Sequence, residues 1–286
     1  MDASRSTARA GDAGGLASGI AAADSSAADS SAADTETSPV IVLTYPHAGA
    51  ELLAEGLAAS RTLAVTSATG ILPLCHDAIA AWQEVDARVG RPSSLAIKSV
   101  RTLAATMMAA IRVRAGAPRW CETSYSGPAA AKAFLRVVPG TTFLCLHRDL
   151  DGVFADALRA YPWGFGGTPF WPYAADHPGN NVATIVAYWI DRTQSLLEFE
   201  KTHPESCVRV RYEDLAEDPE STITATLKTI GVTAGDLHVF RQPVSGRDAV
   251  GQAGTDPQLP YDRVPPLLED RIRELRAELG HVSRVG

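Results

Sequence analysis

A turn near the start of the chain carries residue types suited to binding an anion. It consists of Tyr45, Pro46, His47, Ala48, Gly49, Ala50, Glu51 and Leu52. The apolar run 40–43 before it is typical of a buried strand, and the helix-forming residues 51–59 follow it. A strand, a tight turn and a helix in this order bring unpaired backbone N–H groups and the positive end of a helix dipole to one point. Such a point commonly binds phosphate or sulfate, although an ordinary turn of an α/β domain has the same pattern.

The elements that would position this turn alternate between strand and helix. Further buried strands are predicted at residues 94–99, 141–146 and 207–212, and shorter extended segments at 61–65 and 118–127. Helices are predicted at residues 74–89, 102–114, 128–138, 150–159, 182–202, 219–231 and 267–279. This alternation predicts an α/β domain in which a central, mostly parallel sheet is flanked by helices.

The first 38 residues differ in composition from the rest. They consist mainly of Ala, Ser, Asp, Gly and Thr, with no aromatic residue and almost no large aliphatic one. Such a segment cannot bury enough apolar surface to offset the entropy lost on ordering. We therefore expect residues 1–38 to be a disordered tail and residues 39–286 to form one domain.

Composition and charge exclude several classes of function. The net charge of the 286-residue chain is −7 at pH 7, which disfavours binding to nucleic acid or to an anionic membrane. No apolar run approaches transmembrane length, and the N-terminus lacks the pattern of a secretory signal. We therefore expect a cytoplasmic protein with reduced thiols and no bound metal, because metal-ligand spacing is absent among the cysteines Cys75, Cys121, Cys145 and Cys207.

The segment 161–181 is too rich in Gly, Pro and aromatic residues to form regular structure. A long ordered loop of this kind is usually functional, often as a lid or a pocket wall. Its aromatic side chains are candidates to clasp an apolar or aromatic ligand, or they anchor the loop. These side chains belong to Trp163, Phe165, Phe170, Trp171 and Tyr173.

Four segments lie where predicted strands end: TYPHAGAELL, RWCETS, LHRDLDGVFADAL and RVRYEDLAEDPE. Ligands of open α/β sheets bind beyond the carboxyl ends of the strands. From about Pro39 to its C-terminus the chain resembles bacterial, cytosolic-type sulfotransferases, most specifically in RVRYEDLAEDPESTITATLKTIGV and also in ELRAELGH. The resemblance implies a P-loop-like sulfotransferase fold. It also implies the donor 3′-phosphoadenosine 5′-phosphosulfate (PAPS), its product adenosine 3′,5′-bisphosphate (PAP) and a small-molecule acceptor.

The resemblance further implies roles for single residues. Residues 45–52 would hold the 5′-phosphosulfate of the donor. Arg148 would bind the 3′-phosphate through a permanently charged, forked guanidinium. Arg247 would close over the donor phosphates, while His76 and the loop 161–181 would line the acceptor pocket.

Three residues near the donor depart from the family's pattern. His47 stands where the phosphosulfate loop has lysine, and Glu51 stands where it has a hydroxyl residue. Asp156, eight residues after Arg148, stands where the family usually has a serine that binds the 3′-phosphate. Two acids at two phosphate contacts would oppose PAPS binding by Coulomb repulsion, and most strongly if they are desolvated.

Three residues are candidates for the chemical step. In many relatives a basic histidine follows shortly after a lysine that corresponds to Lys98, but this chain has Val100 there. Glu122 is a candidate base for an acceptor hydroxyl or amine. His47 and Lys98 are candidates to stabilise the developing charge. Each also fits a plainer role, Glu122 in a cap or ion pair and the other two as surface residues.

Three hypotheses of function follow from these residues. The first is a PAPS-dependent sulfotransferase that modifies a hydroxyl or amine of a small molecule, in specialised metabolism. The second is an enzyme of the same fold that no longer uses PAPS and catalyses a different reaction in the same pocket. The third is a non-catalytic binding subunit. A nucleotide kinase is excluded, because the chain has no Gly-Lys-Ser/Thr loop. The sequence leaves open whether the protein forms a homodimer.

Overall fold

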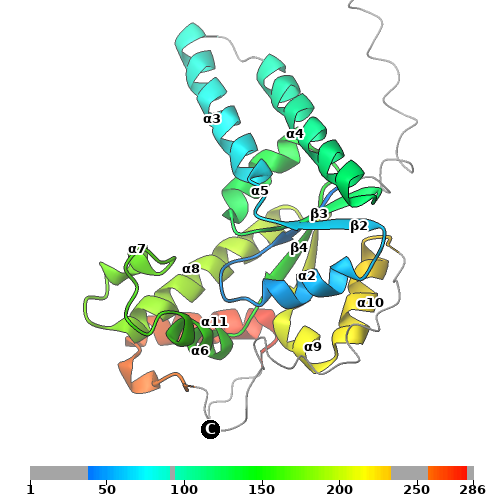
Figure 1. Ribbon diagram of the computed structural model, residues 1–286. Helices are drawn as coiled ribbons and strands as arrows, with labels where there is room; N and C mark the ends of the chain where they lie inside the picture. The colour runs from blue at the N-terminus through cyan, green and yellow to red at the C-terminus, as the bar shows by residue number, and fades with distance from the viewer. Residues whose placement is uncertain (1–37, 91–93, 233–256, 282–286) are drawn as a thin grey trace, which may run out of the picture.

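The computed structural model describes residues 38–90, 94–232 and 257–281 (Figure 1). The predictions for the N-terminal tail and for Arg247 concern residues outside these ranges. Within them, no helix combines the length and the apolar character needed to cross a membrane.

A five-stranded parallel sheet forms the centre of the molecule, with the strand order β2-β3-β1-β4-β5. The strands are β1 (Val40–Leu43), β2 (Leu63–Ser67), β3 (Arg119–Ser124), β4 (Thr142–His147) and β5 (Cys207–Arg211). Every neighbouring pair is parallel. The carboxyl ends of all five strands therefore lie at one edge of the sheet, where ligands of such folds bind. The predicted α/β class with a parallel sheet is confirmed.

Helices cover both faces of this sheet. They are α2 (Ala50–Ala58), α3 (Ile71–Val89), α4 (Ser94–Ala115), α5 (Gly127–Val137), α6 (Leu150–Ala160), α7 (Trp171–Ala174), α8 (Asn181–Thr202), α9 (Tyr212–Glu217), α10 (Pro219–Thr229) and α11 (Pro266–Leu279). A 3₁₀ turn, Tyr261–Arg263, precedes α11. One apolar cluster joins the sheet to α2, α9 and α10, and a larger one joins it to α3, α5, α6, α8 and α11.

The central strand β1 shows why the sheet is buried on both sides. Ile41 and Leu43 belong to the larger apolar cluster, whereas Val40 and Val42 belong to the cluster under α2. Successive side chains of a strand point to opposite faces, so a continuous apolar run suits a parallel strand that helices cover on both faces. Figure 1 shows α2, α9 and α10 gathered on one side of the sheet, and α3 and α4 projecting from the other side.

One predicted strand is wrong. Residues 94–99 begin the long helix α4, and the edge of the sheet is formed instead by β2. A short apolar run cannot be assigned to strand or helix by periodicity alone. The burial of Ala96, Val100 and Ala104 has a period of four residues, which is the helical one. Lys98 is consequently an exposed residue of a helix and not a residue at the end of a strand.

Two other segments carry more helix than we predict from the sequence. The loop 161–181 contains the short helix α7, and the residues after β5 turn directly into α9. The remaining predicted helices are confirmed, with ends shifted by a few residues, as expected for boundaries read from sequence.

Candidate functional site

The turn between β1 and α2 has the backbone geometry of an anion-binding loop. His47 and Gly49 both have a left-handed conformation, with φ of 72° and 83°. The Ala48 N–H donates to the Tyr45 carbonyl at 3.2 Å, which tightens the turn. Left-handed residues in a turn direct backbone N–H groups toward one point and can form a concave nest for anions. No side chain caps the N-terminus of α2 from Gly49, so the dipole end of the helix faces the same point.

Gly49 is required by packing as well as by its conformation. A Cβ atom at this position would lie 2.2 Å from two ring carbons of Tyr212. The ring of Tyr212, at the start of α9, therefore packs directly against the turn at Gly49. This contact gives Tyr212 a structural role in the turn.

The side chain of His47 contacts the aromatic loop. Its ring stacks on Phe170, with centroids 5.5 Å apart and an interplanar angle of 24°. It also meets the edge of Tyr161 at 5.6 Å. Phe165 completes this cluster, with its centroid 5.0 Å from that of Phe170. Two of the loop's predicted ligand-binding aromatics, Phe165 and Phe170, thus pack in the core behind the turn.

Arg148 follows β4 and is already bound to the protein itself. Its Nη1 donates to the His47 carbonyl at 3.0 Å and to the carboxylate of Asp156. Its guanidinium lies over the Tyr212 ring, 4.0 Å from the centroid. Asp156 also accepts a hydrogen bond from Arg159. Arg148 is 7% exposed, and this arrangement makes it a buried support of the turn.

These contacts fit the predicted donor in part. The backbone nest at residues 47–50 suits the 5′-phosphosulfate, because its N–H groups need no lysine to attract an anion. The Arg148 position suits a 3′-phosphate poorly, since Asp156 neutralises the guanidinium and would repel a phosphate at close range. A ligand phosphate would have to displace this carboxylate. Within the described ranges, no group of three or more His, Cys, Asp or Glu residues could hold a metal ion.

Glu122 is buried in β3. It lies opposite Ile41 of β1 and Thr66 of β2 in the parallel register, and it is 1% exposed. The Thr69 hydroxyl donates to its carboxylate. Burial raises the pKa of Glu122 to about 7, although hydrogen bonds from Thr69 lower it in part. A carboxyl group with a pKa near neutral pH can act as either acid or base, so it suits proton transfer.

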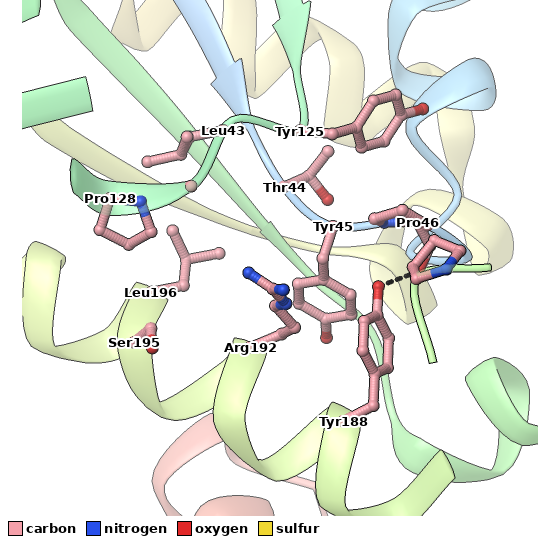
Figure 2. A pocket seen from close by; sticks show the side chains of 12 residues that line it. Leu43, Thr44, Tyr45, Pro46, Tyr125, Pro128, Tyr188, Arg192, Ser195 and Leu196 are labelled. Carbon is pink, nitrogen blue, oxygen red and sulfur yellow. Dashed lines mark hydrogen bonds between the residues drawn. The ribbon is translucent and has the colours of Figure 1, made fainter. Parts of the chain in front are cut away.

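A cavity of about 270 Å³ opens at the carboxyl edge of the sheet, next to the turn (Figure 2). Its lining comes from the end of β1, from the turn after β3, from one residue of the aromatic loop and from α8. The residues are Leu43, Thr44, Tyr45, Pro46, Tyr125, Gly127, Pro128, Pro169, Tyr188, Arg192, Ser195 and Leu196. The Tyr188 hydroxyl donates to the Pro46 carbonyl at 3.2 Å, and the Tyr125 hydroxyl donates to Glu51 at 3.2 Å. The cavity and the anion-binding turn therefore share a wall.

The structure brings together only some of the residues predicted from the sequence. Tyr45 and Pro46 line the cavity, and Glu51 contacts it through Tyr125. Other predicted residues lie elsewhere: His76 pairs with Asp77 on α3, and Trp163 is 98% exposed. The remaining ones are Lys98, exposed on α4, Trp171, which is exposed, and Tyr173, which donates to Asp191.

Sequence reasoning missed the α8 wall. Tyr188, Arg192 and Ser195 recur at the spacing i, i+4, i+7, which places them on one side of a helix. The same side includes the buried Ile185 and Leu196. An arginine within an otherwise apolar helical stripe was the signal that could have indicated a polar cavity here.

Comparison with known proteins defines the class. The model of the Sulfotransferase family matches residues 39–236. This is well over half of the chain, and the chain belongs to the sulfotransferase family. Compared with curated protein sequences, the chain has no significant match.

Two solved structures share the fold. One is the sulfotransferase domain of the olefin synthase of Synechococcus PCC 7002, with 15% identity and a TM-score of 0.53 over 86% of this chain and 97% of that one. Another is the sulfotransferase domain from the curacin biosynthetic pathway, with 14% identity and a TM-score of 0.56 over 86% and 98%. At this identity the likeness establishes the fold only. The substrates must be inferred from the residues of the site.

Proposed function

We propose that this protein transfers the sulfo group of PAPS to a hydroxyl or amine of a small molecule that binds in the cavity beside the β1–α2 turn. One observation carries the proposal: Tyr45 and Pro46, which line the cavity, directly precede the nest at residues 47–50 in the same turn. An anionic donor held by the nest would therefore present its transferable group toward a molecule in the cavity. Sulfo transfer is an in-line displacement that depends on such positioning and on charge stabilisation.

Different residues would stabilise the leaving group and remove the acceptor's proton. The nest and the N-terminus of α2 stabilise the negative charge on the departing phosphate. The acceptor loses a proton as its oxygen or nitrogen bonds to sulfur, and Glu122 is the base we propose. Its side chain belongs to the same face of β3 as Ser124, which pairs with Leu43 in the cavity wall. Two strand residues, about 7 Å, separate Glu122 from Ser124, so a water molecule would relay the proton from the acceptor's hydroxyl or amine to the Glu122 carboxylate.

The proposal is tested by incubating the protein with PAPS and candidate acceptors and detecting PAP and the sulfated product by mass spectrometry. Glu122→Gln should lower kcat by about 100-fold or more, with little change in KM for the donor, because a general base acts only in the transition state. Glu84→Gln on the exposed part of α3 is the matched control. Absence of PAP formation with every acceptor, together with no PAP binding at about millimolar ligand, would exclude the proposal.

A second candidate function follows from the pairing of Arg148 with Asp156. This pairing favours an enzyme of the sulfotransferase family that does not use PAPS, because the position expected to bind the 3′-phosphate carries its own counterion. Calorimetric titration with PAP separates the two. If PAPS is the donor, Asp156→Ser should tighten PAP by about tenfold or more, since removal of one carboxylate frees a forked cation.

The control for this titration is Asp176→Asn, which removes one negative charge from an exposed position. It should leave the affinity for PAP unchanged. If neither the protein nor Asp156→Ser binds PAP, the second candidate replaces the first.

A further inference from the structure

We propose that the molecule bound in this cavity carries a carboxylate, and that Arg192 of α8 binds it. The substrate class is a small hydroxy or amino acid with an apolar or aromatic body. For the transfer step the inference rests on the proposed function; for binding it rests on the cavity alone.

Arg192 is the one charged residue among the 12 that line the cavity. The rest of the lining consists of leucine, proline, glycine and tyrosine residues with two hydroxyl residues, Thr44 and Ser195. Thr44 already donates its hydroxyl to the Leu146 carbonyl at 3.2 Å. A cavity with an apolar wall and one cation is complementary to a molecule with an apolar body and one anionic group.

The charge of Arg192 is only loosely paired within the protein. Its ion pair with Asp191 joins Nε to Oδ2 at 3.8 Å, and the side chains are 39% and 51% exposed. Asp191 is also the acceptor for the Tyr173 hydroxyl, at 2.5 Å. The Arg192 guanidinium lies 5.7 Å from the centre of the Tyr188 ring. A long, exposed ion pair of this kind contributes little interaction free energy. A ligand carboxylate can therefore compete with Asp191 for the guanidinium.

The position of Arg192 also sets the orientation of a bound acid. Tyr188 contacts the Pro46 carbonyl of the turn, and Arg192 lies one helical turn further along α8, about 6 Å from it. Figure 2 shows the guanidinium directed toward the end of β1, with Ser195 and Leu196 on one side and Pro46 and Tyr125 on the opposite side. A carboxylate held by Arg192 would leave the hydroxyl or amine of a short molecule facing the turn, where the donor's sulfo group is expected.

The forked guanidinium of an arginine suits a carboxylate better than the point charge of a lysine ammonium does. Arginine binds a planar carboxylate through two parallel hydrogen bonds, and apolar surroundings strengthen them. The cavity of about 270 Å³ limits the molecule to a small one. A single aromatic or short aliphatic body with one carboxylate and one hydroxyl or amine meets these conditions.

The test uses a matched pair of probes, 4-hydroxyphenylacetate and its uncharged amide, titrated calorimetrically into the full chain without donor. We expect the acid to bind at least about tenfold more tightly than the amide, as a charge-assisted, bidentate contact provides. Arg192→Gln should remove this preference and leave the affinity for the amide unchanged. Arg192→Lys should retain part of it. Arg88→Gln, which neutralises an exposed arginine of α3, is the control and should retain all of it.

Two results would overturn the inference. One is equal affinity for the acid and the amide, which includes no binding of the acid at about 10 mM, a weak-binding limit. The other is a preference for the acid that survives in Arg192→Gln. Failure of the proposed function looks different, because the acid would then bind through Arg192 but give no sulfated product with PAPS. Conversely, sulfation of the amide but not of the acid would support the transferase and refute the carboxylate site.

Discussion

Two arginines on either side of the β1–α2 turn have opposite surroundings. Arg148 is 7% exposed and is bound to Asp156, to the His47 carbonyl and to the face of Tyr212. Arg192 is half-exposed, forms a long ion pair of 3.8 Å with Asp191 and also contacts the side chain of Tyr173. A buried cation must be compensated by the protein itself, whereas a cation at a cavity wall keeps its capacity for a ligand. Arg148, which the resemblance assigns to the donor, is thus engaged by the protein itself, whereas Arg192 lines the cavity.

Two carboxylates repeat this contrast. Asp156 has two arginine partners, Arg148 and Arg159. Glu122 has no cationic partner in the described ranges and accepts hydrogen bonds from Thr69, and burial raises its pKa to about 7. A carboxylate held by cations supports the fold. One that is buried without a cation is poised to exchange a proton near neutral pH.

The largest expected effect distinguishes the two arginines. Arg148→Gln should lower the free energy of unfolding by about 4 kcal/mol, because it leaves the half-buried Asp156 with one partner and removes the support of the turn. Arg192→Gln should lower it by less than about 1 kcal/mol, since exposed ion pairs contribute little. Urea denaturation at pH 7 measures both. Equal losses in the two variants would contradict the contrast.

The next effect concerns the pH dependence of stability through Glu122. Its pKa is raised from 4.5 to about 7 in the folded protein, so folding takes up a proton between these values. The protonated carboxyl group stabilises the fold below pH 4.5, and this contribution, about 3 kcal/mol, is lost as the pH rises to 7. Glu122→Gln has no carboxyl group to ionise and should keep its stability as the pH rises. The variant should therefore become more stable relative to the natural protein between pH 4.5 and 7.

Urea denaturation at several pH values between 4.5 and 8 would show this difference. Glu84→Gln, at an exposed position of α3, should follow the natural protein at every pH. A constant difference between Glu122→Gln and the natural protein would mean that Glu122 titrates at its ordinary pKa, and it would weaken the case for Glu122 as the base.

A smaller effect tests the packing of the turn on the Arg148 side. Gly49→Ala should cost about 2 kcal/mol more than Gly90→Ala, because both residues have positive φ but only Gly49 lies against a ring, that of Tyr212. Gly90 has open space around its Cβ position. Thermal unfolding of the two variants measures the difference. Similar melting temperatures would show that Tyr212 moves aside at little cost.

The smallest effect concerns the contact between the cavity wall and the turn. Tyr188→Phe removes the hydrogen bond to the Pro46 carbonyl and should cost about 1 kcal/mol of stability. It should also raise the KM for the acceptor more than that for the donor, because Tyr188 lines the cavity. Steady-state kinetics with both substrates varied would check this. A change in the donor's KM alone would place the donor, and not the acceptor, in the cavity.

Local sequence patterns were sufficient for most of the fold. The run of Val40 to Leu43, the turn after it and the alternation of strands with helices all depend on neighbours within a few residues, which sequence reveals. The same patterns were insufficient for residues 94–99, because a short apolar run suits strand and helix alike. There the burial of Ala96, Val100 and Ala104 against the core decided in favour of helix.

The site depended on how side chains meet in the folded chain, both between neighbouring elements and between distant ones. The sequence indicated that Asp156 would stand near the 3′-phosphate position, but its pairing with Arg148 follows from the way α6 leaves β4. The cavity joins Pro46 to residues of α8 more than 140 positions away, as the 142-residue separation of the Tyr188–Pro46 hydrogen bond illustrates. The periodicity of α8 alone places Arg192 on the same side as its buried residues. Only the tertiary structure places that side of α8 in one cavity with the end of β1 and the turn after β3. A charge becomes a binding group through what surrounds it.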